Sequence, residues 1–357
     1  ILNMKLPKTF ATLLSLAALT VSTVSCDSTI FDNEGDCESR YEVKFKYIHH
    51  LKYGDAFPYE VASVNLYVFD RSERLVRSFS EPVTQENAEN FSIRLTDLPV
   101  GDYTLLAWCG VKDNPAFTVN PDSRGNETGR TPDYTCRINR DDNGDIHRNL
   151  LHMFHGKKTI TIADDPGDHV IPMELIKNTN IFRIVLQHQG DVTMDPKNFK
   201  FDISDDNGHM GSDNKLLADS RVTYHAFEIE GASAQLKFPE TQIAAVAQDP
   251  ELTADRPSTT VINAVAAEIS VGRLLDSNNA VLRVTEISTG KVIFSLPAID
   301  LALMTKAFDG YSMSDNEFLD RQDRYTMTFL LDDQNNWATK QIHINKWFVV
   351  YNNSTLQ

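Results

Sequence analysis

Three histidines are the residues whose types and spacing come closest to a metal site. His152 and His155, three positions apart, could face one way on a single turn, with His147 shortly before them. A metal site also needs a further ligand and hydrogen bonds that orient its ligands. The chain contains 10 histidines, so a grouping of this kind arises easily by chance. We therefore predict no bound metal and no cofactor.

The acidic run at residues 141–145 (DDNGD) resembles the start of a calcium-binding loop, with oxygen ligands on alternate residues. A complete loop of that kind has glycine at its sixth position and glutamate at its twelfth. Here Ile146 and His152 stand at those two positions. The run is therefore interpreted as a solvated turn.

Motifs for catalysis are missing from the sequence. It contains no GxSxG nucleophile elbow, HExxH, P-loop or GxGxxG. Its aromatic residues fall on the alternate positions of expected strands, which is typical of a sandwich core and not of a carbohydrate-binding platform. We predict that the protein is not an enzyme. The aromatic residues concerned are Phe45, Tyr47, Tyr67, Phe69, Tyr103 and Trp108.

Length and charge narrow the class further. The chain has 357 residues, enough for two domains, and carries 34 Lys+Arg against 50 Asp+Glu, a net charge of -16. Nucleic acid and anionic lipid surfaces both attract clustered basic residues. The composition therefore argues against nucleic acid as a partner and against a basic patch that docks on anionic lipid.

The first 25 residues resemble a bacterial lipoprotein signal peptide. Met4 is interpreted as the start, followed by Lys5, Lys8 and an uncharged stretch at residues 9–25. The alternative, a membrane-spanning helix, needs about 20 apolar residues. Residues 21–26 (VSTVSC) resemble a lipobox, which predicts acylation of Cys26 with chains such as palmitate. The alternative is a cysteine that merely follows an ordinary cleavage site.

Residues 26–36 are expected to form an acidic, extended tether, because they are rich in Asp and Glu and poor in apolar residues. Three cysteines then remain for an oxidising compartment: Cys37, Cys109 and Cys136. One disulfide and one unpaired thiol are expected. The sequence leaves all three pairings open.

The rest of the chain predicts an all-β fold. Residues 41–47 alternate between large apolar and charged side chains, as in a strand with one buried face, and residues 61–70 and 103–108 predict more apolar, central strands. Further short strands continue to the C-terminus, separated by Gly, Pro, Asn and Asp. Residues 298–308 predict a short helix that ends near Gly310, and 315–319 predict a second helical turn. The expected domains are two sandwiches at 37–176 and 177–357, with residues 111–149 as a long loop that interrupts the first.

The N-terminal half resembles the fimbrium-anchoring subunit family of Bacteroides-type (type V) fimbriae. The similarity is strongest over residues 26–110 and weaker at 175–180 and 342–347. It rests on the order of several motifs: Cys37-x3-Tyr41-x-Val43-x-Phe45-x-Tyr47, Val64-x-Leu66-Tyr67-Val68-Phe69-Asp70 and Leu98-Pro99-x-Gly101-x-Tyr103-x4-Trp108.

This resemblance implies a cell-surface lipoprotein of two tandem transthyretin-like β-sandwich domains. It would anchor a fimbrium in the outer membrane through its N-terminal lipid, and its partners would be other fimbrial subunits. Assembly in such systems uses β-strand donation, which satisfies unpaired backbone groups and apolar pockets together.

Two segments matter for assembly. Stalk subunits of related systems lose an N-terminal strand to an arginine-specific protease. The candidate cleavage site here is Arg40, which lies just before the first expected strand. An anchor would keep this site intact. Near the C-terminus an alternating segment could be the donor strand, or it could be the last strand of its own domain. Its bulky residues are Ile342, Ile344, Trp347, Val349 and Tyr351.

Two other functions stay open. A surface adhesin or glycan-binding lipoprotein that never polymerises would bind a host protein or glycan. An exported hydrolase is disfavoured by the missing motifs.

Overall fold

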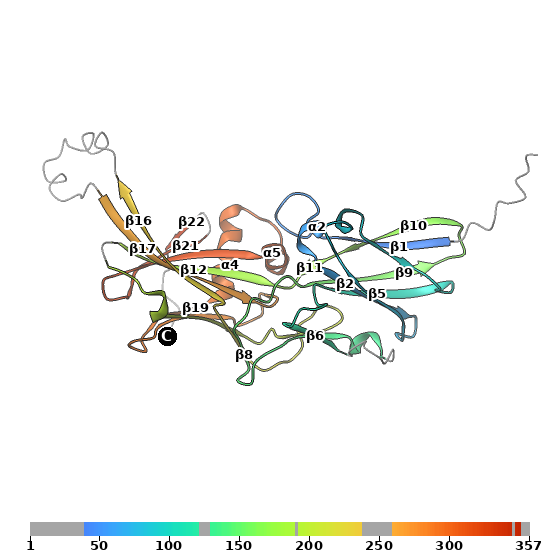
Figure 1. The fold of residues 1–357 in the computed structure, drawn as a ribbon, viewed down its shortest axis with the longest axis horizontal. Coiled ribbons are helices and arrows are strands. Elements are labelled where there is room, and N and C mark those ends of the chain that lie inside the picture. Colours follow the sequence, from blue (N-terminus) through green and yellow to red (C-terminus); the bar gives the residue numbers. More distant parts are fainter. Residues whose placement is uncertain (1–38, 121–128, 190–191, 238–258, 345–346, 351–357) are drawn as a thin grey trace, which may run out of the picture.

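The computed structural model describes residues 39–120, 129–189, 192–237, 259–344 and 347–350. The protein has two β-rich lobes that follow each other along its long axis (Figure 1). The prediction of an all-β protein built from sandwiches is confirmed. In the part of the chain that the structure describes, no helix combines the length and apolar character needed to cross a bilayer.

The N-terminal lobe is a sandwich of a three-stranded sheet (β10-β1-β4) and a five-stranded sheet (β11-β9-β5-β2-β3). Strand β1 has the predicted alternation: Val43 and Phe45 are buried in the core between the sheets, and Lys44 and Lys46 are exposed. The elements of this lobe are β1 (Ser39–Lys46), α2 (Phe57–Glu60), β2 (Ser63–Asp70), β3 (Leu75–Pro82), η1 (Ala88–Asn90), β4 (Ser92–Leu95), β5 (Gly101–Cys109), β9 (Phe154–Ile162), β10 (Gly167–Glu174) and β11 (Ile176–Lys177).

Strand β5 is buried on both faces from Leu105 to Cys109, which explains the apolar run in this part of its sequence. Leu105 and Ala107 contribute to the sandwich core, whereas Leu106 and Trp108 contribute to a second core that continues into the C-terminal lobe. Strand β2 is buried in the same way. The two lobes therefore share apolar contacts.

The C-terminal lobe contains a six-stranded sheet (β16-β17-β12-β20-β21-β22) and a five-stranded sheet (β19-β18-β13-β15-β8). Both predicted helical segments are confirmed as α4 and α5, and α4 ends at Gly310 in the left-handed conformation (φ 72°). The elements are β12 (Asn180–Gln189), η3 (Pro196–Asn198), β13 (Phe199–Asp205), β14 (His209–Met210), β15 (Val222–His225), β16 (Glu228–Lys237), β17 (Thr259–Val271), β18 (Val281–Glu286), β19 (Val292–Pro297), α4 (Ala298–Asp309), α5 (Asp315–Arg321), β20 (Arg324–Leu331), β21 (Trp337–Ile344) and β22 (Trp347–Val350).

Residues 111–149 differ from the predicted loop. Their described parts form β6 (Phe117–Asn120), η2 (Thr131–Asp133), β7 (Thr135–Ile138) and β8 (Asp145–Ile146). Strand β7 pairs with β14 and β8 pairs in parallel with β15, so this segment extends from the N-terminal lobe onto the C-terminal lobe. The predicted division at 176/177 stays a prediction, with β11 still pairing to β9 of the first lobe.

Candidate functional site

The chain enters the described structure at the outer end of the N-terminal lobe. Arg40 is exposed, and its Nη1 lies 3.8 Å from Asp168 Oδ1. It is the second residue of β1 and not, as expected, a residue before the strand. Strand β1 lies between β10 and β4, so chain cleavage after Arg40 would leave residues 41–46 in the middle of the sheet. Cys26, the predicted lipidation site, lies outside the described residues.

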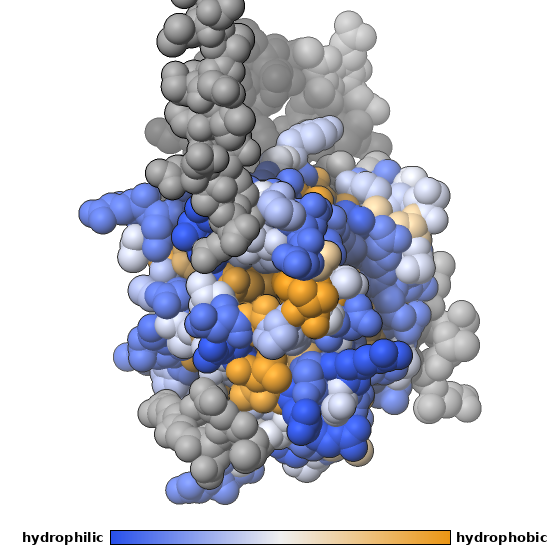
Figure 2. All heavy atoms as spheres, turned by 90° about the vertical axis from the view of Figure 1, so that its right-hand side faces the viewer, coloured by the Kyte–Doolittle hydropathy of each residue, from blue (hydrophilic) through white to orange (hydrophobic). Residues whose placement is uncertain are grey.

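The end face around this entry point is apolar at its centre. Figure 2 looks onto it and shows hydrophobic side chains within a hydrophilic rim. A hollow at this end is lined by Leu98, Val100 and Ile162 together with Arg40. Val100, one of these lining residues, is 66% exposed.

The C-terminal segment pairs within its own sheet. Strand β21 pairs with β20, and β22 pairs with β21 through Ile342↔Val349 and Ile344↔Trp347. The Ile342 side chain is fully buried in the lobe's core. In this arrangement the segment forms the last two strands of its own domain, the alternative that the sequence left open. Donation to a partner stays a prediction, and Tyr351 lies outside the described residues.

The two described cysteines are unpaired. Cys109 and Cys136 are fully buried free thiols, and burial raises the pKa of each well above its ordinary value. Cys109 faces the sandwich core and Cys136 the second core, on different faces of the intervening sheet. The structure therefore excludes a Cys109–Cys136 disulfide, one of the three pairings that the sequence left open. Cys37 lies outside the described residues.

A cleft of about 700 Å³ lies where the lobes meet. Lys177 is buried there, with its Nζ 2.8 Å from Glu60 Oε2 and 2.7 Å from Asp323 Oδ2. Glu60 ends α2 of the first lobe and Asp323 directly precedes β20 of the second. One ammonium group therefore bridges carboxylates from both lobes.

The charges of this cluster affect their neighbours. Burial raises the pKa of Asp323, but the positive charge and hydrogen bond of Lys177 outweigh it, and the net pKa is lowered. Burial and then the Lys177 charge lower the pKa of His152, whose Nδ1 is 3.6 Å from Glu60 Oε2. Burial, followed by the charges of Asp323 and Glu60, raises the pKa of Tyr47. This arrangement joins lobes and offers no activated nucleophile.

His155 lies apart from His152 and is not on a shared turn, because both belong to extended chain around β9. Its Nε2 is 3.1 Å from the carbonyl oxygen of Ser212, and its ring packs edge-on against Trp108. Burial lowers the pKa of His155 to about 4. The ring is therefore neutral, with Nε2–H assigned as donor to Ser212.

His155 should make folding stability depend on pH. An unfolded histidine has a pKa of 6.5, so between pH 6.5 and 4 the unfolded chain takes up a proton that the folded chain does not. The contribution is complete above pH 6.5 and is lost as the pH falls toward 4. Urea unfolding at pH 7 and at pH 4.5 measures this loss. Between the two pH values, we expect the free energy of unfolding of His155→Gln to fall by about 2–3 kcal/mol less than that of the unsubstituted protein. Equal losses in the two proteins would contradict this account.

The acidic run forms the predicted turn. Asp141 Oδ1 accepts hydrogen bonds from the backbone N–H groups of Asn143 and Asp145, both at 2.9 Å. The backbone bond from Asp145 is the largest cause that lowers the pKa of Asp141. The turn leads directly into β8 and so presents Asp145 and His147 beside β15.

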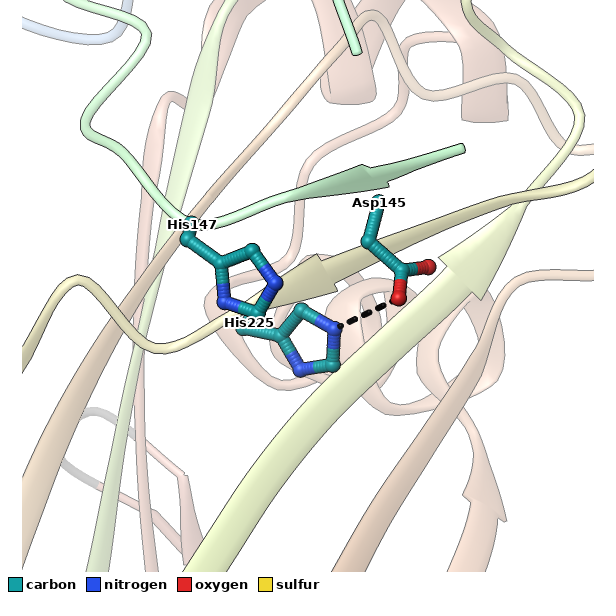
Figure 3. Close-up of side chains that lie close together, drawn as sticks. All are labelled: Asp145, His147 and His225. Atoms are coloured by element: carbon teal, nitrogen blue, oxygen red, sulfur yellow. Dashed lines mark ion pairs between the residues drawn. The ribbon is translucent and has the colours of Figure 1, made fainter. Parts of the chain in front are cut away.

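The third histidine, His147, lies beside residues that the sequence did not connect with it. Its ring stacks on that of His225, with centroids 4.1 Å apart and planes 7° from parallel. His225 Nδ1 is 2.5 Å from Asp202 Oδ1, and its Nε2 is 3.4 Å from Asp145 Oδ2 (Figure 3). His147 therefore does not share a site with His152 and His155, in agreement with the interpretation that their proximity in the sequence arises by chance. Pairing of β8 with β15 brings in His225, and no local sequence pattern signals that contact.

The described residues define a class: a two-lobed β-sandwich protein whose lobes share an apolar core and a buried ion cluster. The family within this class follows from sequence. The chain belongs to the fimbrillin-A associated anchor proteins Mfa1 and Mfa2, whose family model matches residues 33–353. This confirms the resemblance found in the sequence.

Known relatives agree with this family. The chain is 31% identical over 114 residues to the minor fimbrium anchoring subunit Mfa2 of Porphyromonas gingivalis, a match that spans 31% of this chain and 34% of that relative. A Bacteroides thetaiotaomicron structure called a "putative adhesin" is 28% identical with a TM-score of 0.72, over 88% of this chain and 99% of that one. The fimbrial anchor protein Mfa2 from Porphyromonas gingivalis shares the fold, with a TM-score of 0.57 at 17% identity over 88% of this chain and 99% of that one.

Proposed function

We propose that this protein is a cell-surface fimbrial subunit, the outer-membrane anchor of a type V fimbrium, held by a lipid on Cys26. The observation that carries the proposal is the place of Arg40 within β1, read together with family membership. Cleavage there would remove the lipid but leave β1 between its two neighbours, so it would open no strand-wide groove. Trimming would cost the protein its tether without creating an acceptor site, which suits a subunit that stays uncut.

The apolar end face of the N-terminal lobe is consistent with an anchor that points this end toward the membrane. The described chain begins at Ser39 and Arg40 beside this hollow, so a lipid on the preceding tether would hold this end toward the membrane. The C-terminal lobe would then face outward, toward other fimbrial subunits.

Mass spectrometry of the mature protein from its native membrane tests the anchor proposal. We expect an N-terminus at Cys26 that carries acyl chains and a chain uncut after Arg40. Cys26→Ala should lose the acyl mass and the firm membrane association, because burial of acyl chains at about 0.8 kcal/mol per CH₂ provides the anchoring. Cys136→Ala is the control, since that thiol is buried in the core and its loss should leave acylation unchanged. An unacylated N-terminus, or one at Tyr41, would overturn the proposal.

We further propose that the next subunit joins by β-strand pairing at the C-terminal segment with Ile342, Ile344, Trp347, Val349 and Tyr351. Within the described residues β22 is the outermost strand of its sheet, so its outer edge can pair with another chain. Truncation before Trp347 should leave a folded, acylated protein, because β21 retains its pairing with β20. Fimbriae should then be shed into the medium. Firmly attached fimbriae on cells with the truncated protein would contradict strand pairing at this end.

A binding role is the second candidate, favoured by the 28% identity to a structure called a "putative adhesin". Saturable binding of a host protein or glycan by the isolated monomer, with fimbriae unaffected by gene deletion, would favour this role over the anchor.

A further inference from the structure

We propose that Asp145, His147 and His225 form a binding site for a divalent transition metal of the Zn²⁺ class. The site lies where β8, reached from the N-terminal lobe, pairs with β15 of the C-terminal lobe. One ligand atom from each of these residues lies within 4.8 Å of the other two. Imidazole nitrogen and carboxylate oxygen are the ligands that Zn²⁺ takes besides cysteine sulfur. The proposal is independent of any fimbrial role.

His225 is already oriented as a metal ligand. Its Nδ1 is held by Asp202 Oδ1 at 2.5 Å, the carboxylate–histidine contact that commonly fixes the ring of a ligating histidine. The residue is only 8% exposed, yet its buried Nε2 has no hydrogen-bond partner. Its contact with Asp145 Oδ2 at 3.4 Å is an ion pair only when the ring is protonated, so on a neutral ring a bound cation would satisfy this buried nitrogen.

The second ligand is at the right separation. His225 Nε2 and Asp145 Oδ2 are 3.4 Å apart. Two ligands at about 2.0–2.1 Å from one tetrahedral Zn²⁺ lie roughly 3.3–3.4 Å from each other. The separation of these two atoms therefore matches that of two ligands of one ion.

His147 must turn to become the third ligand. Nitrogen lone pairs lie in the plane of the imidazole ring, and two nearly parallel rings at 4.1 Å cannot both direct them at one ion. The His147 side chain is 60% exposed, and its Nε2 lies 3.5 Å from Asp141 Oδ2. The ring can therefore leave the stack toward the ion, and water would complete the coordination on the open side.

The surrounding charges favour a cation. Asp145, Asp202 and Asp141 all approach the two rings, and Lys200 Nζ is engaged by Asp202 Oδ2 at 3.1 Å. A bound metal would fasten the turn at residues 141–147 to β15. Zinc would thereby strengthen the contact between the two halves of the chain.

Calorimetric titration of the full mature chain with Zn²⁺ tests the site. We expect one equivalent to bind with a Kd on the order of micromolar, and thermal unfolding to shift upward in zinc. His147→Ala should weaken binding at least about tenfold and abolish the shift. Because His147 is exposed, this variant should fold normally, which circular dichroism in the absence of metal checks.

Two further variants sharpen the result. Asp145→Asn removes the carboxylate with little change in shape and should weaken zinc binding as His147→Ala does. His152→Ala is the matched control, because His152 lies in the cleft between the lobes and should leave zinc binding unchanged. Absence of saturable zinc binding, or equal affinity in the unsubstituted protein and His147→Ala, would overturn the proposal.

Discussion

Lys177→Met is expected to destabilise the protein by about 3–5 kcal/mol, the typical cost of removing one partner from a buried ion pair. The Lys177 side chain is 5% exposed and bonds to Glu60 and Asp323, which are themselves 15% and 20% exposed. Without the ammonium group, the carboxylates of Glu60 and Asp323 would lose their closest cation and keep only the more exposed Lys52, whose Nζ is 3.5 Å from Glu60 Oε1. Methionine keeps the length and apolar volume of the lysine stem, so the loss should report the charge. Chemical denaturation at pH 7 measures it.

A triple variant provides the control for this prediction. Combining Lys177→Met with Glu60→Gln and Asp323→Asn removes all three charges and should recover most of the lost stability, because no uncompensated carboxylate remains. If the triple variant is as unstable as Lys177→Met, the loss comes from packing and not from charge.

The pH dependence gives a second check on the same cluster. The pKa of Asp323 is lowered in the folded protein, so its contribution is present above its ordinary value of 3.8 and is lost as the pH falls through the folded value. Lys177→Met removes the charge that lowers this pKa. The difference in stability between the two proteins should therefore narrow in acid.

Much of the fold follows from the sequence because burial leaves a periodic pattern. The alternation of β1 is visible since one face meets the core, and the continuous apolar run of β5 reflects burial on both faces. The helix α4 is marked by its apolar side and by Gly310 at its end. In these elements local sequence and tertiary contacts favour the same structure.

In the strands that the sequence does not predict, local sequence and tertiary contacts do not favour the same structure. The sequence does not predict strand β9, because Gly156, Lys157 and Lys158 interrupt its apolar pattern, although the strand pairs with β5 along its whole length. Strands β6, β7 and β8 are short, and their partners lie far away in the sequence. Their existence depends on tertiary pairing that no local window contains.

The candidate sites likewise divide into features set by local sequence and features set by tertiary pairing. The position of Arg40 near the start of β1 could be predicted to within a residue or two, because it depends on local alternation. The contact of His147 with His225 could not, because it depends on the register between β8 and β15. Likewise, the core that each cysteine faces depends on how the sheets stack, so spacing alone could not exclude a Cys109–Cys136 bond.

Gly110→Ala is expected to destabilise the protein by roughly 2–5 kcal/mol. Gly110 directly follows β5 and has a φ of 76°, where a side chain costs about 1–2 kcal/mol. A Cβ there would also lie 2.1 Å from the carbonyl oxygen of His152, so the backbone of one of the two segments must move. Forced shifts of this kind typically cost a further 1–3 kcal/mol or so. Denaturant unfolding of the purified variant measures the sum.

Gly290→Ala separates the two contributions. Gly290 has nearly the same φ, 71°, in the turn between β18 and β19, but a Cβ there would meet no atom within 4 Å. Its substitution should cost only the conformational part, about 1–2 kcal/mol. The difference between the variants then measures how rigidly residues 110 and 152 hold each other at the cleft between the lobes. Equal losses would mean that the His152 segment yields freely and that this wall of the cleft, which belongs to the N-terminal lobe, is soft.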